Sequence, residues 1–369
     1  MASMQIPLVD LKAQYARIAP EIEATMAEVI RTTAFIGGPA VGALEKEFAA
    51  FCGAKYGVGC SSGTSALHLA LIAAGVGPGD EVLTVSHTFI ATSEVVKPMG
   101  ARVRFVDIDP ETFTMDPAQI ESALTPQTKV LLPVDLYGHP VDMDPITEIA
   151  RRRGLRVVED AAQAHGARYK GRLCGALAPL ATFSFYPGKN LGAYGDAGFV
   201  TAENVAEADL MRKLANHGRA EKYLHDVEGY NYRLDTMQAA ILRVKLPHLA
   251  QWNQERRRAA GWYDERLRGV AGVVTPKTAP WAEHVFHIYA IRVAERDRVL
   301  TSLRERGIDA GVHYPVPLHL QPAYRYLGHA RGDFPATEKA ADEVLSLPLY
   351  PEITEAQVDQ VVAALRASL

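Results

Sequence analysis

Short apolar segments alternate with helical patterns between about residues 54 and 199. Six of these segments are rich in β-branched residues, and most of the six are too apolar to have a solvent-facing side, as expected of parallel strands buried between helices. The segments between them show helix-period apolar spacing or begin with Pro or Asp. The alternation predicts an α/β fold, a three-layer sandwich around a mostly parallel sheet. The predicted strands are 56–60, 81–86, 103–108, 129–136, 156–160 and 182–185, and the predicted helices are 64–74, 90–99, 117–124 and 142–153.

The regions on either side of this alternation have a different pattern. Residues 18–30 and 41–51 form amphipathic helical patterns, which would pack on the α/β domain or on a partner subunit. After about Leu246 a long helix rich in Arg and Glu is followed by an apparent strand at 287–292, a helix near 296–306 and a Pro-rich loop. We therefore expect a large domain over 1–246 and a smaller α+β domain over 247–369.

Composition excludes several classes of protein. The net charge is −4 and the basic residues are scattered, so there is no electrostatic footprint for nucleic acid. No apolar stretch is long enough to span a bilayer, and the first residues lack a signal-peptide pattern, so we expect no membrane contact and a cytoplasmic location. Cys52, Cys60 and Cys174 are odd in number and far apart, which argues for reduced core residues and against disulfides or a zinc site.

The first candidate site is the run of small residues Ser-Ser-Gly-Thr-Ser at 61–65, which follows a predicted strand and opens a predicted helix. Backbone N–H groups at such a helix start can approach a phosphate, and the positive end of the helix favours an anion. Simple N-capping by Ser or Thr explains the same pattern. The motif alone leaves both interpretations open.

The second site is the acid pair Glu159 and Asp160, at the carboxyl end of a buried strand, where open α/β sheets bind ligands. A buried carboxylate needs a cationic partner, and the protonated pyridine nitrogen of a cofactor such as pyridoxal 5'-phosphate (PLP) is one. Alternatively, one acid caps the next helix and the other pairs with an Arg. We favour this second interpretation for Glu159.

The third site is Gly-Lys-Asn-Leu-Gly at 188–192. A lysine between a polar turn and a Gly-rich run does not fit a regular solvated face. In a cleft its pKa can fall far enough for the amine to act as nucleophile and base near neutral pH. Ser184, at the end of the preceding strand, is placed to bind the same phosphate as Thr64.

These motifs occur in one order at the ends of successive strands, and together they resemble the DegT-like (DegT/DnrJ/StrS) nucleotide-sugar aminotransferases, PLP enzymes of the aspartate-aminotransferase fold. The resemblance covers nearly the whole chain. One departure is Gly-Asp-Ala-Gly at 195–198, where relatives often have Gly-Asp-Gly-Gly, so Ala197 would be strained if its φ were positive. The other quoted motifs are Pro-Leu-Val-Asp-Leu at 7–11, Phe-Ile-Gly-Gly-Pro at 35–39, Gly-Tyr-Asn-Tyr-Arg at 229–233 and Val-His-Tyr-Pro at 312–315.

The resemblance implies a role for each matching residue. Lys189 would carry PLP as a Schiff base, Asp160 would pair with the pyridine nitrogen and Gln163 would meet the ring hydroxyl. Asn231 would reach the phosphate from the other subunit of a homodimer, so that each active site is shared. Phe89 would cover the ring, with His87 as the weaker alternative and a core role for Phe89 as the other possibility. The remaining phosphate contacts would be Gly63, Thr64, Ser65 and Ser184.

The resemblance also implies amination of a keto-hexose carried by dTDP or UDP, with L-glutamate as amino donor and the ketone at C3 rather than C4. His313, Tyr314 and His319 lie in a Pro-rich loop, where we favour sugar contact over mere stiffening of the connection. Arg219 and Arg233 are candidates for the substrate phosphates, or for structural ion pairs. Alternatives are a PLP-dependent sugar dehydratase, which Lys189 disfavours, an aminotransferase for a non-nucleotide keto-sugar or cyclitol, and a non-catalytic PLP-binding regulator.

Overall fold

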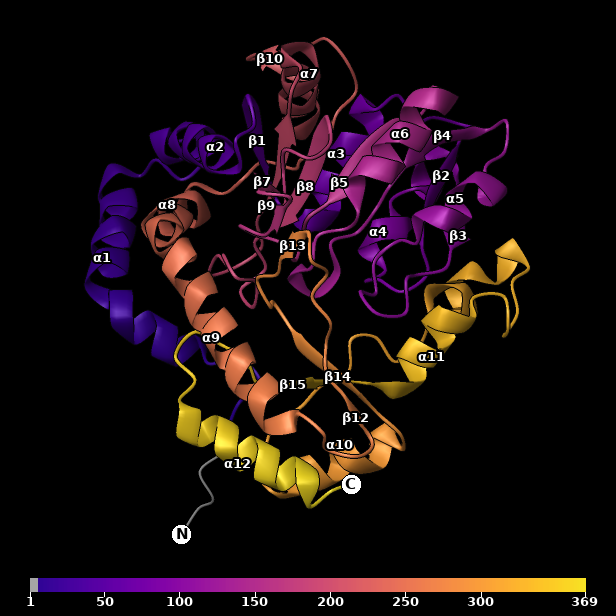
Figure 1. Cartoon of the computed structure of the whole chain (residues 1–369). Coiled ribbons are helices and arrows are strands. Elements are labelled where there is room, and N and C mark those ends of the chain that lie inside the picture. The colour runs from indigo at the N-terminus through magenta and orange to yellow at the C-terminus, as the bar shows by residue number, and fades with distance from the viewer. Residues whose placement is uncertain (1–5) are drawn as a thin grey trace.

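A seven-stranded sheet forms the centre of the computed structural model, which describes residues 6–369 (Figure 1). The strand order is β1-β9-β8-β5-β4-β2-β3. All six predicted strands are present, five of them within two residues of the predicted bounds, whereas the strand predicted at 129–136 already ends at Leu131. The seventh strand, β9, was not predicted, and it runs antiparallel to both neighbours, so the sheet is mostly parallel. The strands are β1 Tyr56–Cys60, β2 Glu81–Val85, β3 Arg102–Val106, β4 Thr128–Leu131, β5 Arg156–Asp160, β8 Leu180–Ser184 and β9 Gly198–Ala202.

Helices cover both faces of this sheet, as the uniformly apolar strands predict. Neighbouring residues of one strand enter different cores: Val82 packs with helices α3, α4 and α7, whereas Leu83 packs with α2, α5, α6 and α8. The predicted helix 90–99 is broken, because Pro98 lacks an N–H, into a short α4 and a 3-10 turn. The helices are α2 Pro39–Cys52, α3 Gly63–Ala73, α4 Ala91–Glu94, α5 Pro117–Ala123, α6 Met143–Arg153, α7 Val205–Ala215 and α8 Thr236–Lys245.

Two long helices flank this layered part of the molecule. Helix α1 (Leu11–Thr32) begins earlier than predicted and packs on α8 and the start of the next long helix, where Ile18 and Ile22 meet Ile241 and Trp252. Helix α9 (Leu249–Leu267) runs diagonally from α8 towards the C-terminal part, as Figure 1 shows. None of the helices within 6–369 combines the length and apolar character needed to cross a bilayer.

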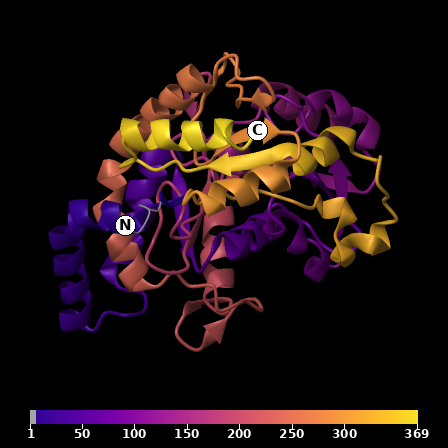
Figure 2. The same ribbon diagram turned by 90° about the horizontal axis from the view of Figure 1, so that it is seen from below.

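The C-terminal part has its own small sheet and apolar cluster. The antiparallel sheet β12-β14-β15 packs against α9, α10 and α12, and Ile6 joins the same cluster (Figure 2). The strand predicted at 287–292 and the helix predicted near 296–306 are thus confirmed. The domain division at residue 246 stays a prediction. The elements here are β12 Val273–Val274, β14 Tyr289–Val293, α10 Arg296–Glu305, α11 Pro335–Glu343, β15 Val344–Leu347 and α12 Glu355–Arg366.

Ala197 and Gly198, where β9 begins, pass directly behind the turn that opens α3. Ala197 is buried and its φ is not positive, so the strain considered for this position does not arise. Gly198 is the constrained residue: a Cβ there would lie 2.1 Å from the carbonyl oxygen of Ser62. Close contact between two backbones therefore fixes the turn that precedes Gly63.

Cys52, Cys60 and Cys174 are free and buried.

Gly198→Ala should destabilise the fold by about 1–3 kcal/mol, because backbone atoms cannot yield as a flexible side chain would. Gly42→Ala in α2, where a Cβ meets nothing within 4 Å, is the matched control and should be neutral or stabilising by up to about 1 kcal/mol. Thermal unfolding of the cofactor-free proteins measures both. Equal melting temperatures for the two variants would refute the backbone-contact argument.

Candidate active site

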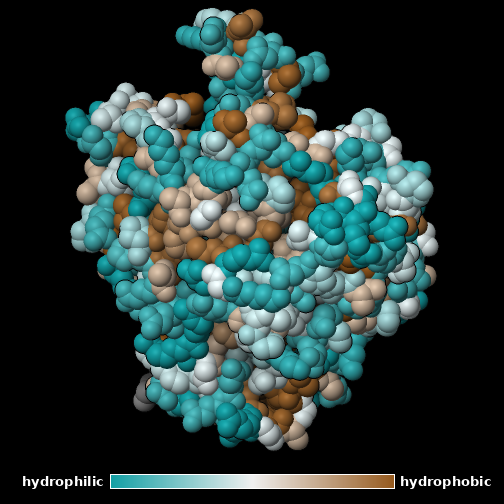
Figure 3. Space-filling model, turned by 45° about the horizontal axis from the view of Figure 1, so that its top comes forward, coloured by the Kyte–Doolittle hydropathy of each residue, from teal (hydrophilic) through white to brown (hydrophobic). Residues whose placement is uncertain are grey.

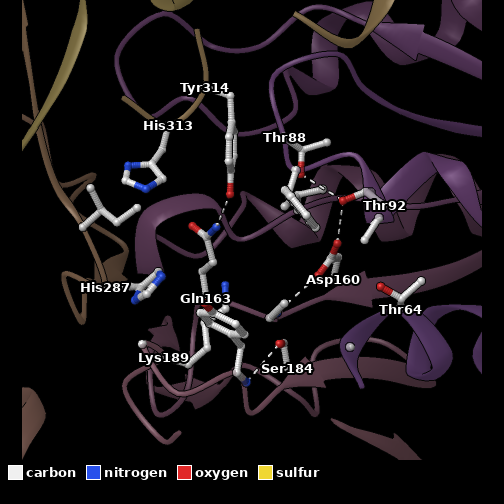
Figure 4. A pocket seen from close by; sticks show the side chains of 18 of the residues that line it. Thr64, Thr88, Thr92, Asp160, Gln163, Ser184, Lys189, His287, His313 and Tyr314 are labelled. Carbon is white, nitrogen blue, oxygen red and sulfur yellow. Dashed lines mark hydrogen bonds between the residues drawn. The ribbon is translucent and has the colours of Figure 1, made fainter. Parts of the chain in front are cut away.

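A cavity of about 650 Å³ lies at the carboxyl ends of β5 and β8 and extends to the C-terminal part of the chain. Its walls come from segments that are far apart in the sequence, from Leu8 to Leu349. Figure 4 shows the side chains of this pocket around Lys189. The predicted site residues that line it are Gly63, Thr64, Phe89, Asp160, Gln163, Ser184, Lys189, His313 and Tyr314.

The start of α3 forms one end of the cavity. Ser62 caps the helix in a reciprocal box with Ser65, whose hydroxyl also bonds the Ser62 carbonyl at 2.9 Å. Ser65 is therefore buried in the cap and its side chain does not line the cavity, contrary to the phosphate role expected for it. Within residues 6–369 the Thr64 hydroxyl has no hydrogen-bond partner. A Cβ on Gly63 would lie 2.7 Å from that of Ser184, so this turn and the end of β8 are in close contact.

Asp160, on the last position of β5, is 4% exposed. One carboxylate oxygen accepts the Thr92 hydroxyl at 2.8 Å and the other accepts the Ala162 N–H at 3.2 Å. Burial raises the pKa of Asp160, while these two donors and the positive charge of Lys189 act in the opposite direction. Thr92, missed by the sequence analysis, is itself bonded to the Thr88 hydroxyl at 2.9 Å. Such a carboxylate is suited to a cationic ligand.

Lys189 lies on a tight turn after β8. Burial lowers the pKa of its amine to about 8, although the Asp160 charge counteracts part of this shift. The turn is held closed by the bond from the Lys189 N–H to the Tyr186 carbonyl, 2.9 Å, and Lys245 donates to the Gly192 carbonyl at 2.6 Å. The amine is therefore neutral in a useful fraction of molecules near physiological pH.

Gln163 fixes the wall opposite this turn. Its amide oxygen accepts the Tyr137 N–H at 2.7 Å, which sets the orientation of the amide, and its nitrogen donates to the Tyr314 hydroxyl at 3.3 Å. The pKa of Tyr314 is raised to about 12, mainly by burial. Tyr314 therefore remains a neutral hydroxyl at the cavity wall.

Phe89 and His87 are two residues apart but lie in different environments. Phe89 is 52% exposed, lines the cavity and has its ring 5.8 Å from that of Tyr314. His87 is buried outside the cavity, with its Nε2 3.0 Å from the Tyr137 hydroxyl, and burial lowers its pKa to about 4. The alternative of His87 as the stacking residue is therefore wrong for this geometry, and so is a core role for Phe89.

His319 does not reach the cavity, which corrects its assignment as a substrate residue. It is 2% exposed, with Nδ1 2.7 Å from the Ser86 hydroxyl and Nε2 3.0 Å from a carboxylate oxygen of Glu338. These bonds attach the Pro-rich loop to the end of β2. His313 and Tyr314, on the same loop, do line the cavity, as does His287, which the sequence analysis missed.

Asn231, Arg219 and Arg233 lie outside this cavity. Asn231 is exposed and pairs with Asn216, and Arg219 lies on the hairpin of β10 (Arg219–Glu221) and β11 (Leu224–His225). Arg233 donates to the Asn216 side chain at 3.3 Å. The protomer alone therefore does not bring these three side chains to Lys189.

Glu159 points to the opposite face of β5 from Asp160. Its carboxylate accepts the N–H groups of Gly175 at 2.9 Å and Leu177 at 3.3 Å, so the interpretation that we favoured for Glu159, a helix cap or a pairing with an Arg, is wrong. Asp135 and Cys174 are its buried neighbours, with ligand-type atoms within 4.8 Å of one another. Burial and the Glu159 charge raise the pKa of Asp135, which favours its protonated form.

The cavity residues fit a PLP molecule in size and chemistry. Within residues 6–369 no cationic side chain is hydrogen-bonded to the buried carboxylate of Asp160, and the positive charge of Lys189 lowers its pKa. The other end of the cavity has the free Thr64 hydroxyl and the helix start that suit a phosphate. Gln163, already held by Tyr137, has the donor that a ring hydroxyl needs.

We expect Asp160→Asn to lower the Lys189 pKa further below 8, because the Asp160 charge is what raises it. Labelling of Lys189 in the cofactor-free protein by an amine reagent, followed by peptide mass spectrometry across pH, gives the midpoint. Asp196→Asn is the control, since it removes another acid of the cavity wall and should leave the midpoint near 8. A midpoint that rises in Asp160→Asn would contradict the electrostatic coupling.

Comparison with known proteins agrees with this geometry. The profile of the DegT/DnrJ/EryC1/StrS aminotransferase family matches residues 16–366. The chain is 50% identical to the "pleiotropic regulatory protein" of Geobacillus stearothermophilus, over 97% of each chain. It is 46% identical to the dTDP-3-amino-3,4,6-trideoxy-alpha-D-glucose transaminase of Streptomyces venezuelae, over 98% of this chain and 96% of the relative.

Among solved structures, S. venezuelae DesV in complex with a ketimine intermediate has a TM-score of 0.96 at 46% identity, over 98% of both chains. Agreement at this level covers the large sheet, the cavity and the C-terminal sheet together. The chain belongs to the DegT/DnrJ/EryC1/StrS aminotransferase family of PLP-dependent enzymes.

Proposed function

We propose that this enzyme transfers an amino group from L-glutamate to the ketone of a nucleotide-linked hexose, at C3, with dTDP or UDP as the nucleotide. The observation that carries the proposal is the pair of Lys189 and Asp160, an amine of lowered pKa and a buried carboxylate in one cavity. The Streptomyces venezuelae relative, a 3-amino-sugar transaminase by name, supports position 3 and the dTDP-sugar.

PLP, when bound, supplies a ring that withdraws electrons and a carbon that carries the amino group between the two substrates. Asp160 would hold the ring nitrogen, Gln163 the ring hydroxyl, and Thr64 with Ser184 the phosphate, while Phe89 would lie against the ring. Lys189 has the proton-transfer role. As a neutral amine it accepts the proton from the reacting carbon of the donor at Nζ, and the pKa near 8 lets it return that proton at the same pH.

The second substrate needs contacts outside the cofactor pocket. We assign Tyr314 and His313 to the sugar, because both line the cavity from the C-terminal part of the chain. Arg219 and Arg233 remain our candidates for the nucleotide phosphates, and the protomer geometry requires that they act from a partner subunit. Guanidinium groups match phosphate oxygens in pairs, which supports this assignment.

Two other functions have specific points in their favour. A sugar dehydratase shares the fold, but in that branch His replaces the lysine, whereas this chain has Lys189. A regulatory role is suggested by the name of the Geobacillus stearothermophilus relative. The presence of Asp160, Gln163, Thr64 and Ser184 in one cavity with Lys189 favours turnover over binding alone.

We further propose a homodimer with shared active sites. The β10–β11 hairpin projects from the top of the molecule, and apolar side chains gather on the surface beneath it (Figure 3). Tyr223 and Leu224 on the hairpin are 79% and 59% exposed, and Ile36 is 62% exposed. Such exposed apolar groups are typical of a subunit interface. The cytoplasmic location stays a prediction from the sequence.

The proposed function is tested by converting the purified protein to its amino form with L-glutamate and adding keto-sugar nucleotides with the ketone at C3 or C4. We expect loss of the near-visible absorbance with glutamate, and its return with the C3 ketone. Borohydride should fix the cofactor to Lys189, detected by peptide mass. Lys189→Ala should lose at least about a thousandfold in rate, since it removes both nucleophile and base.

Several results would count against the proposal. Return of absorbance only with free keto-acids would remove the sugar substrate, and a dehydrated sugar product would favour the dehydratase. Absence of any spectral change with glutamate in protein that holds the cofactor would favour the regulator.

The shared site is tested with mixed dimers of Lys189→Ala and Asn231→Ala. Each variant alone should be impaired. If Asn231 acts in the partner's cavity, random mixing makes half of the dimers mixed, and each mixed dimer has one intact site out of two. The expected activity is therefore about one quarter of the wild-type value. Co-refolded or co-expressed subunits with two different affinity tags provide the material. Activity no higher than the average of the two parents would show that Asn231 serves its own subunit or neither.

A further inference from the structure

Two imidazoles occupy the side of the cavity that lies away from the phosphate end. Figure 4 shows His287 and His313 on one side of Lys189, and Thr64 and Ser184 on the other. All of these side chains line the same cavity. A ligand held at its phosphate end by Thr64 and Ser184 therefore leaves the imidazole side free for a second group.

Neither imidazole has its hydrogen-bonding capacity filled by residues 6–369. The Nδ1 atom of His287 is buried and has no partner, and its Nε2 is likewise unbonded. The Nδ1 atom of His313 lies 2.9 Å from the Ser346 hydroxyl, while its Nε2 is unbonded. When Ser346 donates to Nδ1, the His313 proton is on Nε2. Both rings can thus offer an N–H to a ligand in the cavity.

The groups whose charges act on these two rings are basic. Besides burial, the groups that lower the pKa of His287 are all basic: Lys189, Arg256, His313 and His165. For His313, whose pKa is lowered to about 4, the causes are burial and Lys189. No carboxylate of residues 6–369 opposes these shifts. The immediate surroundings of His287 are therefore basic, and the nearest opposing charges, Glu352 and Asp160, act on Arg256 and on Lys189. Basic surroundings of this kind favour an anionic group on the ligand.

Arg256 keeps His287 in this position. Its guanidinium is 3% exposed and donates to the backbone carbonyls of His287 at 3.4 Å and Leu349 at 3.0 Å. No carboxylate is hydrogen-bonded to Arg256 in the described chain. The Glu352 charge acts on Arg256 and counteracts part of the effect of burial on its pKa, while the bonds of Arg256 hold the segment that carries His287.

We propose that His287 and His313 bind the α-carboxylate of the amino donor. This inference rests on the proposed function, because it assumes an amino acid as the first substrate. The α-carboxylate is attached to the carbon whose proton Lys189 removes, so it must lie within a few ångströms of Lys189 Nζ. Thr64 and Ser184 at the phosphate end would bind the phosphate of the cofactor. Both imidazoles line the cavity that contains Lys189 and keep an unbonded nitrogen, so they can donate to a carboxylate there, whereas the ring of a keto-hexose offers them no charged group.

The test compares His287→Phe, which removes the N–H, with His287→Gln, which keeps a side-chain N–H. Conversion of the bound cofactor is followed with L-glutamate, its γ-amide L-glutamine and its α-amide L-isoglutamine, and then with the keto-sugar nucleotide. His248→Phe, remote from the cavity, is the control. Calorimetric affinity for 2-oxoglutarate, which has the carboxylate but no amine, gives a readout independent of turnover.

His287→Phe should weaken the response to glutamate and glutamine by at least about tenfold, the value of a hydrogen bond to a charged group. Its response to isoglutamine and to the keto-sugar nucleotide should change by less than about threefold, and His287→Gln should recover most of the loss. Affinity for 2-oxoglutarate should fall in parallel. If His287→Phe does not fold, His287→Leu, which also removes the N–H, takes its place.

An equal loss with isoglutamine, or an equal loss in the sugar step, would overturn the carboxylate assignment and leave the proposed function standing. Wild-type protein that responds to no amino acid would instead defeat the proposed function. In that event unchanged 2-oxoglutarate affinity in His287→Phe would overturn the carboxylate site as well.

Discussion

The burial of Asp160 is the constraint on which the active site depends. A carboxylate that is 4% exposed is costly unless donors and a positive charge surround it. Thr92 and Ala162 supply two donors, and Lys189 supplies the positive charge that acts on it. The carboxylate still lacks a directly bonded cation, and a protonated ring nitrogen of the cofactor would supply one. The same burial lowers the pKa of Lys189, so one environment prepares both the acid and the amine.

Adjacent positions on β5 show how strand geometry divides two like residues between different tasks. Because side chains alternate across a strand, Asp160 faces the cavity while Glu159 faces the opposite core. There Glu159 accepts two backbone N–H groups and lies beside Asp135, whose pKa is raised by burial and by the Glu159 charge. A slip of one residue in the register would exchange these environments. The sheet register, fixed by apolar cores on both faces, thus decides which acid meets the ligand.

The sequence predicted most of the large sheet because six buried strands have continuous apolar patterns bounded by turns. It missed β9, which begins inside the Gly-rich run after Lys189 and pairs in the antiparallel direction, and no periodicity marks that reversal. Site residues at strand ends, such as Asp160 and Ser184, were predictable because parallel strands bring their carboxyl ends to one edge. Thr92 and His287 were not predictable from the sequence, since their place depends on a broken helix and on how the C-terminal part packs.

His319 and His313 illustrate why loop residues resist assignment from sequence alone. Both belong to one Pro-rich segment, and chemistry gives no reason to separate them. In the structure, both ring nitrogens of His319 are hydrogen-bonded, one to Ser86 and the other to Glu338. His313 keeps one nitrogen free at the cavity. The bonds of His319 attach the loop to the large sheet, and this attachment places His313 and Tyr314 at the cavity wall. A residue without ligand contact thereby determines where the ligand-facing residues lie, and such a role depends on tertiary contacts rather than on residue type.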